Sequence, residues 1–335
     1  MDESFELPED IEEKNEKAKL IAEQFERVRK EVAKLIVGQD SIIERLLIAL
    51  LSDGHVLLEG LPGLGKTMMI STLARVIGCN FKRVQFTPDL LPADIIGTKV
   101  YNQKTLSFET KIGPIFTNIL LADEINRAPP KTQAALLEGM QERQVTISGD
   151  TLKLPKPFFV LATQNPIELE GTYPLPEAQV DRFLLKVMVS YPSREEEIAI
   201  MDRIAANYNP ELEKILESKE IVCFQRFVKD VYMDEKIKKY IADIIFASRR
   251  PEEFELKDLK PLVEYGASPR ASISLALASK AKAVLEGRGY VIPDDVKALA
   301  FDVLRHRLIL SYEAEAEEIK VDDVISRIIE AIEPP

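Results

Sequence analysis

Cysteine and histidine are scarce in this sequence. It has two cysteines, Cys79 and Cys223, and two histidines, His55 and His306, far apart from one another. No C-x-x-C pair occurs, so we interpret both cysteines as small apolar side chains in a reducing compartment. Neither histidine has a second His or Cys at metal-ligand spacing, and this argues against a transition-metal site.

Long apolar runs and a basic excess are also missing. No stretch of about 18 apolar residues could span a bilayer. The acidic beginning, MDESFELPEDIEEKNEK, lacks the apolar region of a signal peptide, and we therefore expect a cytoplasmic protein. The net charge is −12, and the densest basic run is the short KIKK at residues 236–239. Because a nonspecific nucleic-acid binder usually has a basic face, this charge disfavours that class.

The chain is long enough for two domains, with 335 residues, 46% of them apolar. Residues 11–36 have apolar positions at helical spacing, and a second helical run follows the break VGQ at residues 37–39. Segments of strand length then appear at 55–59, 82–87, 118–123, 158–164 and 184–190. They are apolar nearly throughout, as strands buried on both faces are, and helical segments lie between them. The pattern predicts an α/β fold with a mostly parallel sheet covered by helices.

Two segments depart from simple β-α alternation. Residues 97–113 are typical of two short strands around a polar turn, and residues 144–154 of a hairpin that turns at Ser148-Gly149-Asp150. After Pro192 strands almost vanish, and helical runs cover 224–250, 268–286, 294–307 and 321–332. We predict an N-terminal helical segment (1–36), an α/β domain with two inserted hairpins (37–191) and a small all-helical domain (192–335).

A phosphate-binding pattern, G-x-x-x-x-G-K-[ST], occurs as GLPGLGKT directly after the strand HVLLE and before a helical run. The glycines let backbone N–H groups close around phosphates, Lys66 reaches the outer phosphates, and the Thr67 hydroxyl can ligate Mg²⁺. The structural alternative is a turn that only joins strand to helix. We assign nucleotide binding to Gly60, Leu61, Pro62, Gly63, Leu64, Gly65, Lys66, Thr67 and Met68.

The nature of the base can also be argued. No N/T-K-x-D segment, the usual guanine reader of phosphate-loop GTPases, occurs in the sequence, so adenine and hence ATP are favoured. The break before the second helix, formed by Val37, Gly38 and Gln39, is interpreted as one wall of the adenine site.

The segment ILLADE, residues 119–124, is an apolar strand that ends in two carboxylates. Asp123 at the strand tip can hold Mg²⁺ through water, and Glu124 is placed to polarise an attacking water. Acidic residues often end strands, but a pair on a strand after the phosphate loop favours catalysis. The second carboxylate distinguishes a hydrolase from a protein that only holds nucleotide.

Asn165 follows the strand FFVLAT, which in such a sheet would lie beside the other two functional strands. Its amide could orient the lytic water or contact the γ-phosphate. An Asn before Pro166 also commonly makes a turn, and this alternative stays open.

Arg182 lies between a proline-rich loop and a further strand, at the far side of the expected sheet from the phosphate loop. We interpret it as an arginine finger that enters a neighbouring subunit's site and stabilises transition-state charge. This interpretation predicts a ring. The alternative is an ion pair with Glu177 or Asp181.

Arg270 lies in GASPRAS, where Ser268 is the expected N-cap of a helix and Pro269 its first residue. A cation in the first turn opposes the helix dipole, so Arg270 needs a partner. That partner is either a γ-phosphate or a structural carboxylate.

Together these segments resemble the AAA+ ATPases, and within them the MoxR family. The resemblance rests on VGQ, LLEGLPGLGKT, LLADEINRAPPKTQAALLEGMQERQVT, ATQNPIELEGTYPLPEAQVDRF and GASPRAS, and it runs from about Val37 to the C-terminus. It implies that Lys66 and Thr67 belong to Walker A and Asp123 and Glu124 to Walker B. It likewise implies that Asn165 is sensor 1, Arg182 the arginine finger and Arg270 sensor 2, and that the two hairpins are the helix-2 insert and the pre-sensor-1 hairpin.

The resemblance also implies a hexameric ring with a chaperone-like task, such as maturing, activating or inserting a metal into a partner protein. That partner often carries a von Willebrand factor A domain. Two alternatives are a nucleic-acid motor like the MCM and McrB relatives, which the acidic charge disfavours, and a scaffold in which nucleotide only sets the oligomeric state.

Overall fold

The computed structural model describes residues 10–61, 63–165, 171–206, 208 and 210–335. The chain forms two compact units, one of residues 27–223 and one that combines the N-terminal residues through 26 with residues 224–335. The divisions fall inside helix α1 (Ile11–Ala33) and helix α8 (Ser218–Asp230). We call these the α/β unit and the helical unit.

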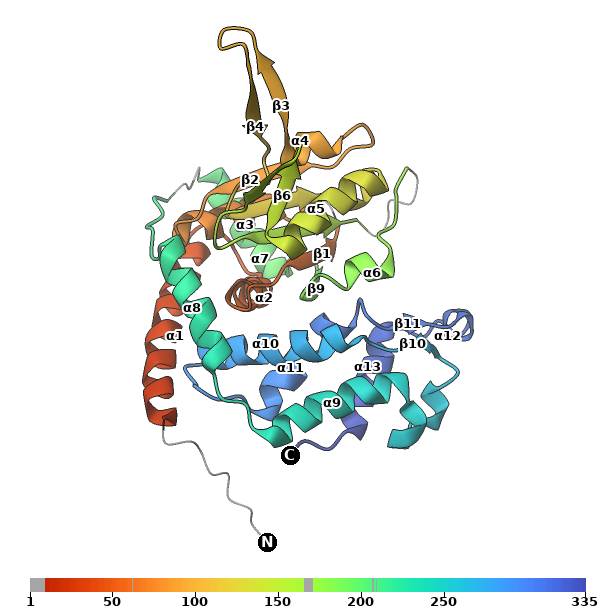
Figure 1. Ribbon diagram of the computed structural model, residues 1–335. Helices are drawn as coiled ribbons and strands as arrows, with labels where there is room; N and C mark the ends of the chain where they lie inside the picture. The colour runs from red at the N-terminus through yellow and green to blue at the C-terminus, as the bar shows by residue number, and fades with distance from the viewer. Residues whose placement is uncertain (1–9, 62, 166–170, 207, 209) are drawn as a thin grey trace. The chain divides into compact units, whose positions relative to one another are not determined.

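The α/β unit contains a five-stranded parallel sheet in the order β2-β5-β8-β1-β9 (Figure 1). Its strands are β1 (Val56–Gly60), β2 (Phe81–Gln85), β5 (Ile119–Asp123), β8 (Phe159–Gln164) and β9 (Leu185–Val189). The central strands are buried along almost their whole length, which confirms the prediction from their apolar sequences. Because the strands are parallel, the carboxyl ends of β1, β8 and β5 meet at one edge, where ligands bind in such sheets.

Helices connect and cover these strands. In the α/β unit they are α2 (Asp40–Leu51), α3 (Lys66–Val76), α4 (Pro92–Ile96), α5 (Pro130–Glu142), α6 (Glu177–Val180) and α7 (Arg194–Ala205), with a 3-10 turn, η1, at Ile125–Arg127. Helix α7 begins with the expected capping box, since Ser193 N donates to Glu196 and Glu196 N to Ser193 Oγ.

The α/β unit extends beyond the predicted boundary near Tyr191, because the chain after α7 bonds back to it. Arg203 donates to the carbonyl oxygens of Ala33 and Lys34, and Ile215 N donates to Val76 O at 2.7 Å. These contacts come from the end of α7 and the segment that follows it.

Both predicted hairpins are present. Strands β3 (Gly97–Asn102) and β4 (Ser107–Ile112) project from the rest of the unit (Figure 1). Strands β6 (Gln144–Ile147) and β7 (Asp150–Lys153) join through Ser148 and Gly149, whose φ values are 48° and 93°. Positive φ at both loop residues is typical of a two-residue hairpin turn. An ion pair of 2.7 Å between Lys99 and Asp150 connects the two hairpins.

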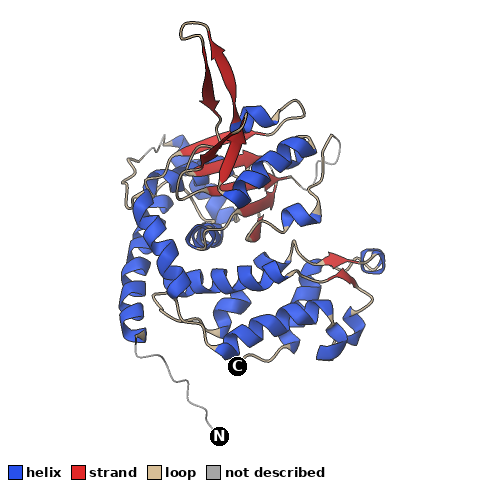
Figure 2. Cartoon of the chain, in the orientation of Figure 1, coloured by secondary structure: helices blue, strands red, loops and turns tan. Residues whose placement is uncertain are grey.

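The helical unit contains the last part of α8 together with α9 (Glu235–Arg249), α10 (Pro269–Leu285), α11 (Pro293–Leu304), α12 (Tyr312–Ala316) and α13 (Val321–Ala331). The strands among the described residues of this unit form a short antiparallel pair, β10 (Val263–Tyr265) and β11 (Ile309–Leu310) (Figure 2). The predicted helical run 224–250 is two helices, because Asp234 begins α9 by accepting a hydrogen bond from Lys236 N.

In the part of the chain that the structure describes, no helix combines the length and apolarity needed to cross a membrane.

Candidate active site

The phosphate loop joins β1 to α3, as the pattern predicts. Gly63 and Gly65 have φ values of 83° and 70°, a conformation that strains other residues. A Cβ at either position would meet no atom within 4 Å, so their backbone borders open space. Lys66 is the first residue of α3, and its Nζ donates to Gly60 O at 2.6 Å across the loop. The free N–H groups at the start of α3 add to an anion-binding arrangement.

A cavity of about 380 Å³ brings the two carboxylates and the phosphate loop together. Its lining comprises Gly60, residues 63–68, Arg83, Asp123, Glu124, Thr163, Gln164 and Asn165. It therefore includes Lys66, Thr67, Asp123, Glu124 and Asn165, which were predicted from separate segments. Pro62, also predicted to bind nucleotide, lies outside the described residues.

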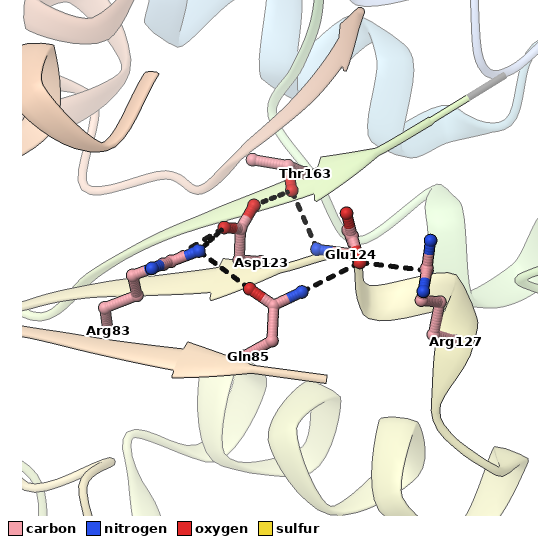
Figure 3. Close-up of polar contacts among 6 residues, drawn as sticks. All are labelled: Arg83, Gln85, Asp123, Glu124, Arg127 and Thr163. Carbon is pink, nitrogen blue, oxygen red and sulfur yellow. Dashed lines mark hydrogen bonds and ion pairs between the residues drawn. The ribbon is translucent and has the colours of Figure 1, made fainter. Parts of the chain in front are cut away.

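Asp123, at the end of β5, is held by two neighbouring strands (Figure 3). Arg83 of β2 donates to Asp123 Oδ2 through Nη2 at 2.6 Å and through Nε at 3.1 Å. Thr163 of β8 donates through Oγ1 to Asp123 Oδ1 and accepts from Glu124 N at 2.8 Å. Thr163 thus fixes both the Asp123 carboxylate and the backbone that leads to Glu124.

Glu124 has a φ of 54°, which is uncommon for a residue with a side chain and turns the chain from β5 into η1. Its Oε2 accepts from Gln85 Nε2 at 2.8 Å and pairs with Arg127 Nε at 2.9 Å (Figure 3). Arg83 Nη2 also donates to Gln85 Oε1, so one network joins both carboxylates. The unusual backbone conformation of Glu124 favours a functional role for this residue, and its side-chain contacts with Gln85 and Arg127 are both made by Oε2.

Arg83, Gln85, Arg127 and Thr163 were not identified from the sequence. The segment 82–87 was read as a buried strand, but its burial alternates, with Val84 buried between exposed Arg83 and Gln85. That alternation marks an edge strand with polar residues on one face. The sequence signal that could have found Arg83 and Gln85 is the alternation of polar and apolar residues in RVQF, residues 83–86.

Lys66 lies in a partly buried, charged environment. Burial lowers the pKa of its ammonium from the ordinary value, while Asp123 and Glu124 oppose this by stabilising the charged form. Two carboxylates beside one lysine leave the cavity with both signs of charge, which suits a metal–phosphate ligand.

A second cavity of about 510 Å³ adjoins the phosphate loop and is mostly apolar. Its lining comprises residues 35–37, Gln39, Gly63, Leu64, Gly65, Met68, Pro192, Ile200, Arg203 and Tyr208. Gln39 also donates from Nε2 to Leu64 O at 3.1 Å, which ties this wall to the phosphate loop. Val37 and Gln39 of the predicted adenine wall therefore line it, while Gly38 is not among its lining residues.

Arg182 does not line the cavity that holds the two carboxylates. It follows α6, and its Nη1 donates to Leu137 O of α5 at 3.3 Å rather than to the carboxylate of Glu177 or Asp181. Its Nε is buried and has no hydrogen-bond partner among the described residues. A partly buried guanidinium held by one carbonyl agrees with a role outside its own site, and the finger role stays a prediction.

Arg270 belongs to the helical unit, where its loop is well fixed. Ser268 caps α10 by accepting from Arg270 N at 3.2 Å, and Pro269 is the first helical residue, as predicted. Arg249 Nε donates to Ala267 O at 2.6 Å. The Arg270 side chain is exposed, and its contribution to catalysis stays a prediction.

These features define a phosphate-loop nucleotide-binding protein with a helical second unit. Comparison with known protein families supports this class. The family described as "ATPase family associated with various cellular activities (AAA)" matches residues 55–185, and the AAA lid domain matches residues 257–328.

Similar proteins of known sequence or structure support the same class of protein. Chaperone MoxR1 of Mycobacterium tuberculosis is 51% identical over 311 residues, covering 93% of this chain and 82% of that protein. Protein MoxR of Methylorubrum extorquens is 32% identical, covering 92% and 94%. A crystal structure described as that of a candidate ATPase from Cytophaga hutchinsonii shares 47% identity with a TM-score of 0.91, covering 97% and 98%. The chain belongs to the MoxR family of AAA+ ATPases.

Proposed function

We propose that this protein hydrolyses ATP with Mg²⁺, acts as an oligomeric ring in which each site is completed by a neighbour's arginine, and uses the cycle to remodel partner proteins in the cytoplasm. The observation that carries the proposal is the convergence of Lys66, Thr67, Asp123, Glu124 and Asn165 on one cavity. For the ring we propose six subunits, the number that the family resemblance implies.

The residues at the cavity fit a magnesium ion. Thr67 and Asp123 offer oxygen ligands, and the described residues contain no group of three or more His, Cys, Asp or Glu side chains that could cage a metal. Mg²⁺ usually takes one or two protein oxygens and completes its shell with phosphates and water. When bound, it would neutralise charge on the phosphate oxygens.

The chain's own residues divide the remaining work. Lys66 and the N-terminus of α3 bind the phosphates, and Asp123 holds the metal shell. Glu124 polarises the attacking water, and Asn165, 8% exposed at the end of β8, orients it. The apolar cavity lined by Val37, Gln39 and Met68 takes the adenine base.

The enzymatic part can be tested by phosphate release. We expect turnover with ATP and Mg²⁺, loss of turnover with EDTA, and a lower rate with GTP because no guanine-reading segment is present. Lys66→Ala should weaken nucleotide binding as well as turnover, since it removes a phosphate-binding cation. Absence of ATP binding by the wild type, measured by calorimetry, would contradict the proposal.

The client-binding part is assigned to the β3–β4 hairpin. It exposes apolar side chains, including Tyr101 at 48% and Phe108 at 70%, whose rings contact each other across the strands at 5.3 Å. Isolated apolar exposure is ordinary, but a cluster on a projecting insertion favours protein binding. We propose that this hairpin contacts the client, including a partner with a von Willebrand factor A domain and, for such a client, metal insertion.

Deletion of the hairpin tests this assignment. Gly113 N donates to Ile96 O at 3.1 Å, so the two ends lie together and residues 98–112 can be replaced by a short link. We expect the deletion to abolish copurification of the von Willebrand factor A domain protein encoded nearest to this chain, with ATPase activity retained. Asp150→Ala, which breaks only the Lys99 ion pair, is the control. Unchanged copurification by the deletion variant would exclude the hairpin as the client contact.

A further inference from the structure

Helix α5 contacts both the turn that follows Glu124 and the segment that leads to Arg182. The contact is made by Gln133, which is fully buried. Its Nε2 donates to Ile125 O at 3.2 Å, to Ala128 O at 3.1 Å and to Tyr173 O at 2.9 Å. The first two carbonyls belong to the turn after Glu124, and the third belongs to the Arg182 segment. One amide group therefore joins two parts of the chain that are distant in sequence.

The same two parts are fastened together at further points. Tyr173 N donates to Asn126 O at 2.6 Å, so the backbone bonds run in both directions. Leu175 and Phe183 are buried in the core that also contains α5. At the end of the segment, Arg182 donates to Leu137 O, one helical turn beyond Gln133. The segment from Tyr173 to Arg182 is thus held along α5 at both ends.

We propose that Gln133 is a positioning residue that couples the Glu124 turn of one subunit to the Arg182 that this subunit presents to its neighbour. This inference rests on the proposed function, in which Arg182 acts in a neighbouring site. If the Gln133 amide moved away from the Glu124 turn, the buried carbonyl groups of Ile125 and Ala128 would lose this donor, which is costly. A displacement of the turn when nucleotide binds beside Glu124 is therefore carried to Tyr173 and on to Arg182.

Mixed oligomers separate this role from a merely structural one. A Glu124→Gln subunit is expected to hydrolyse ATP very slowly but still to supply Arg182, whereas an Arg182→Ala subunit should hydrolyse ATP efficiently only with a neighbour's arginine. Mixing the two should restore activity. Adding Gln133→Met to the Glu124→Gln donor removes the three hydrogen bonds with little change of volume. We expect the restored kcat to fall by about tenfold or more, since small misplacements of catalytic groups cost this much, while the KM for ATP is unchanged.

Thr132 provides a matched control on the same helix. It is 1% exposed, and its Oγ1 donates to Leu90 O at 2.7 Å, away from both the Glu124 turn and the Arg182 segment. Adding Thr132→Val to the donor removes one side-chain hydrogen bond from the same helix with little change of volume, and it leaves the bonds of Gln133 in place. We expect this donor to restore activity as well as the simple Glu124→Gln donor does.

Activity is expressed per donor subunit assembled in mixed oligomers, so that loss of folding is not counted as loss of coupling. If the Gln133→Met donor does not assemble, Gln133→Glu, of nearly equal shape, is measured by the same criterion. A Gln133 variant that assembles and restores full activity overturns the inference alone. Failure of the simple Glu124→Gln donor to restore activity overturns the arginine finger of the proposed function, and the inference with it.

Discussion

Arg182→Ala is expected to lower ATP hydrolysis per subunit by about 10³-fold or more, the range found where an arginine finger is removed. Nucleotide affinity should be retained, because Arg182 lies outside the cavity formed by the phosphate loop and the two carboxylates. For the wild type, activity per subunit should rise with protein concentration as sites are completed by neighbours. Phosphate release against concentration, with ATP affinity measured in parallel, tests both expectations.

Arg182→Lys is the matched variant, since it keeps the charge but loses the planar fork of donors. We expect it to recover only a small part of the lost rate. Flat activity with concentration and normal turnover by Arg182→Ala would mean that the guanidinium serves only its hydrogen bond to Leu137 O. The ring would then lose its main mechanistic support.

Glu124→Gln is expected to lower the rate of hydrolysis by about 10²–10⁴-fold, the usual contribution of general acid–base catalysis. The amide has the shape of the carboxylate but cannot accept a proton from water. ATP affinity should change little, because Lys66 and the start of α3 provide the phosphate contacts. Single-turnover hydrolysis and equilibrium ATP binding measure the two quantities separately.

Glu142→Gln is the control for that variant. Glu142 is an exposed residue of α5 and does not line the cavity, so the same chemical change there should leave turnover unaltered. Equal turnover by Glu124→Gln and the wild type would exclude Glu124 as the catalytic base. The network of Gln85 and Arg127 around its carboxylate would then be a structural one.

Much of the fold could be predicted from local sequence patterns. The apolar segments are the strands of one parallel sheet, because a strand buried on both faces needs apolar residues throughout. The loop GLPGLGKT joins a strand to a helix, and Gly63 and Gly65 have the positive φ values that such a turn requires. Ser193, Ser268 and the turn at Gly149 were likewise predictable, since caps and tight turns depend on neighbouring residues.

Contacts between distant segments could not be predicted in this way. Arg83 and Gln85 reach Asp123 and Glu124 because β2 pairs with β5 with Gln85 beside Asp123, a register that the sequence of β2 does not specify. Gln133 lies in an ordinary amphipathic helix, and its three carbonyl partners come from two other segments.

The sequence by itself therefore determined the class of fold, the phosphate loop and the pair of carboxylates, because each depends on residues that are neighbours along the chain. Only the tertiary structure decided which side chains hold those carboxylates and how the Arg182 segment is fastened to α5. These contacts depend on strand order, register and helix packing, which are set by burial of the whole core rather than by any one segment.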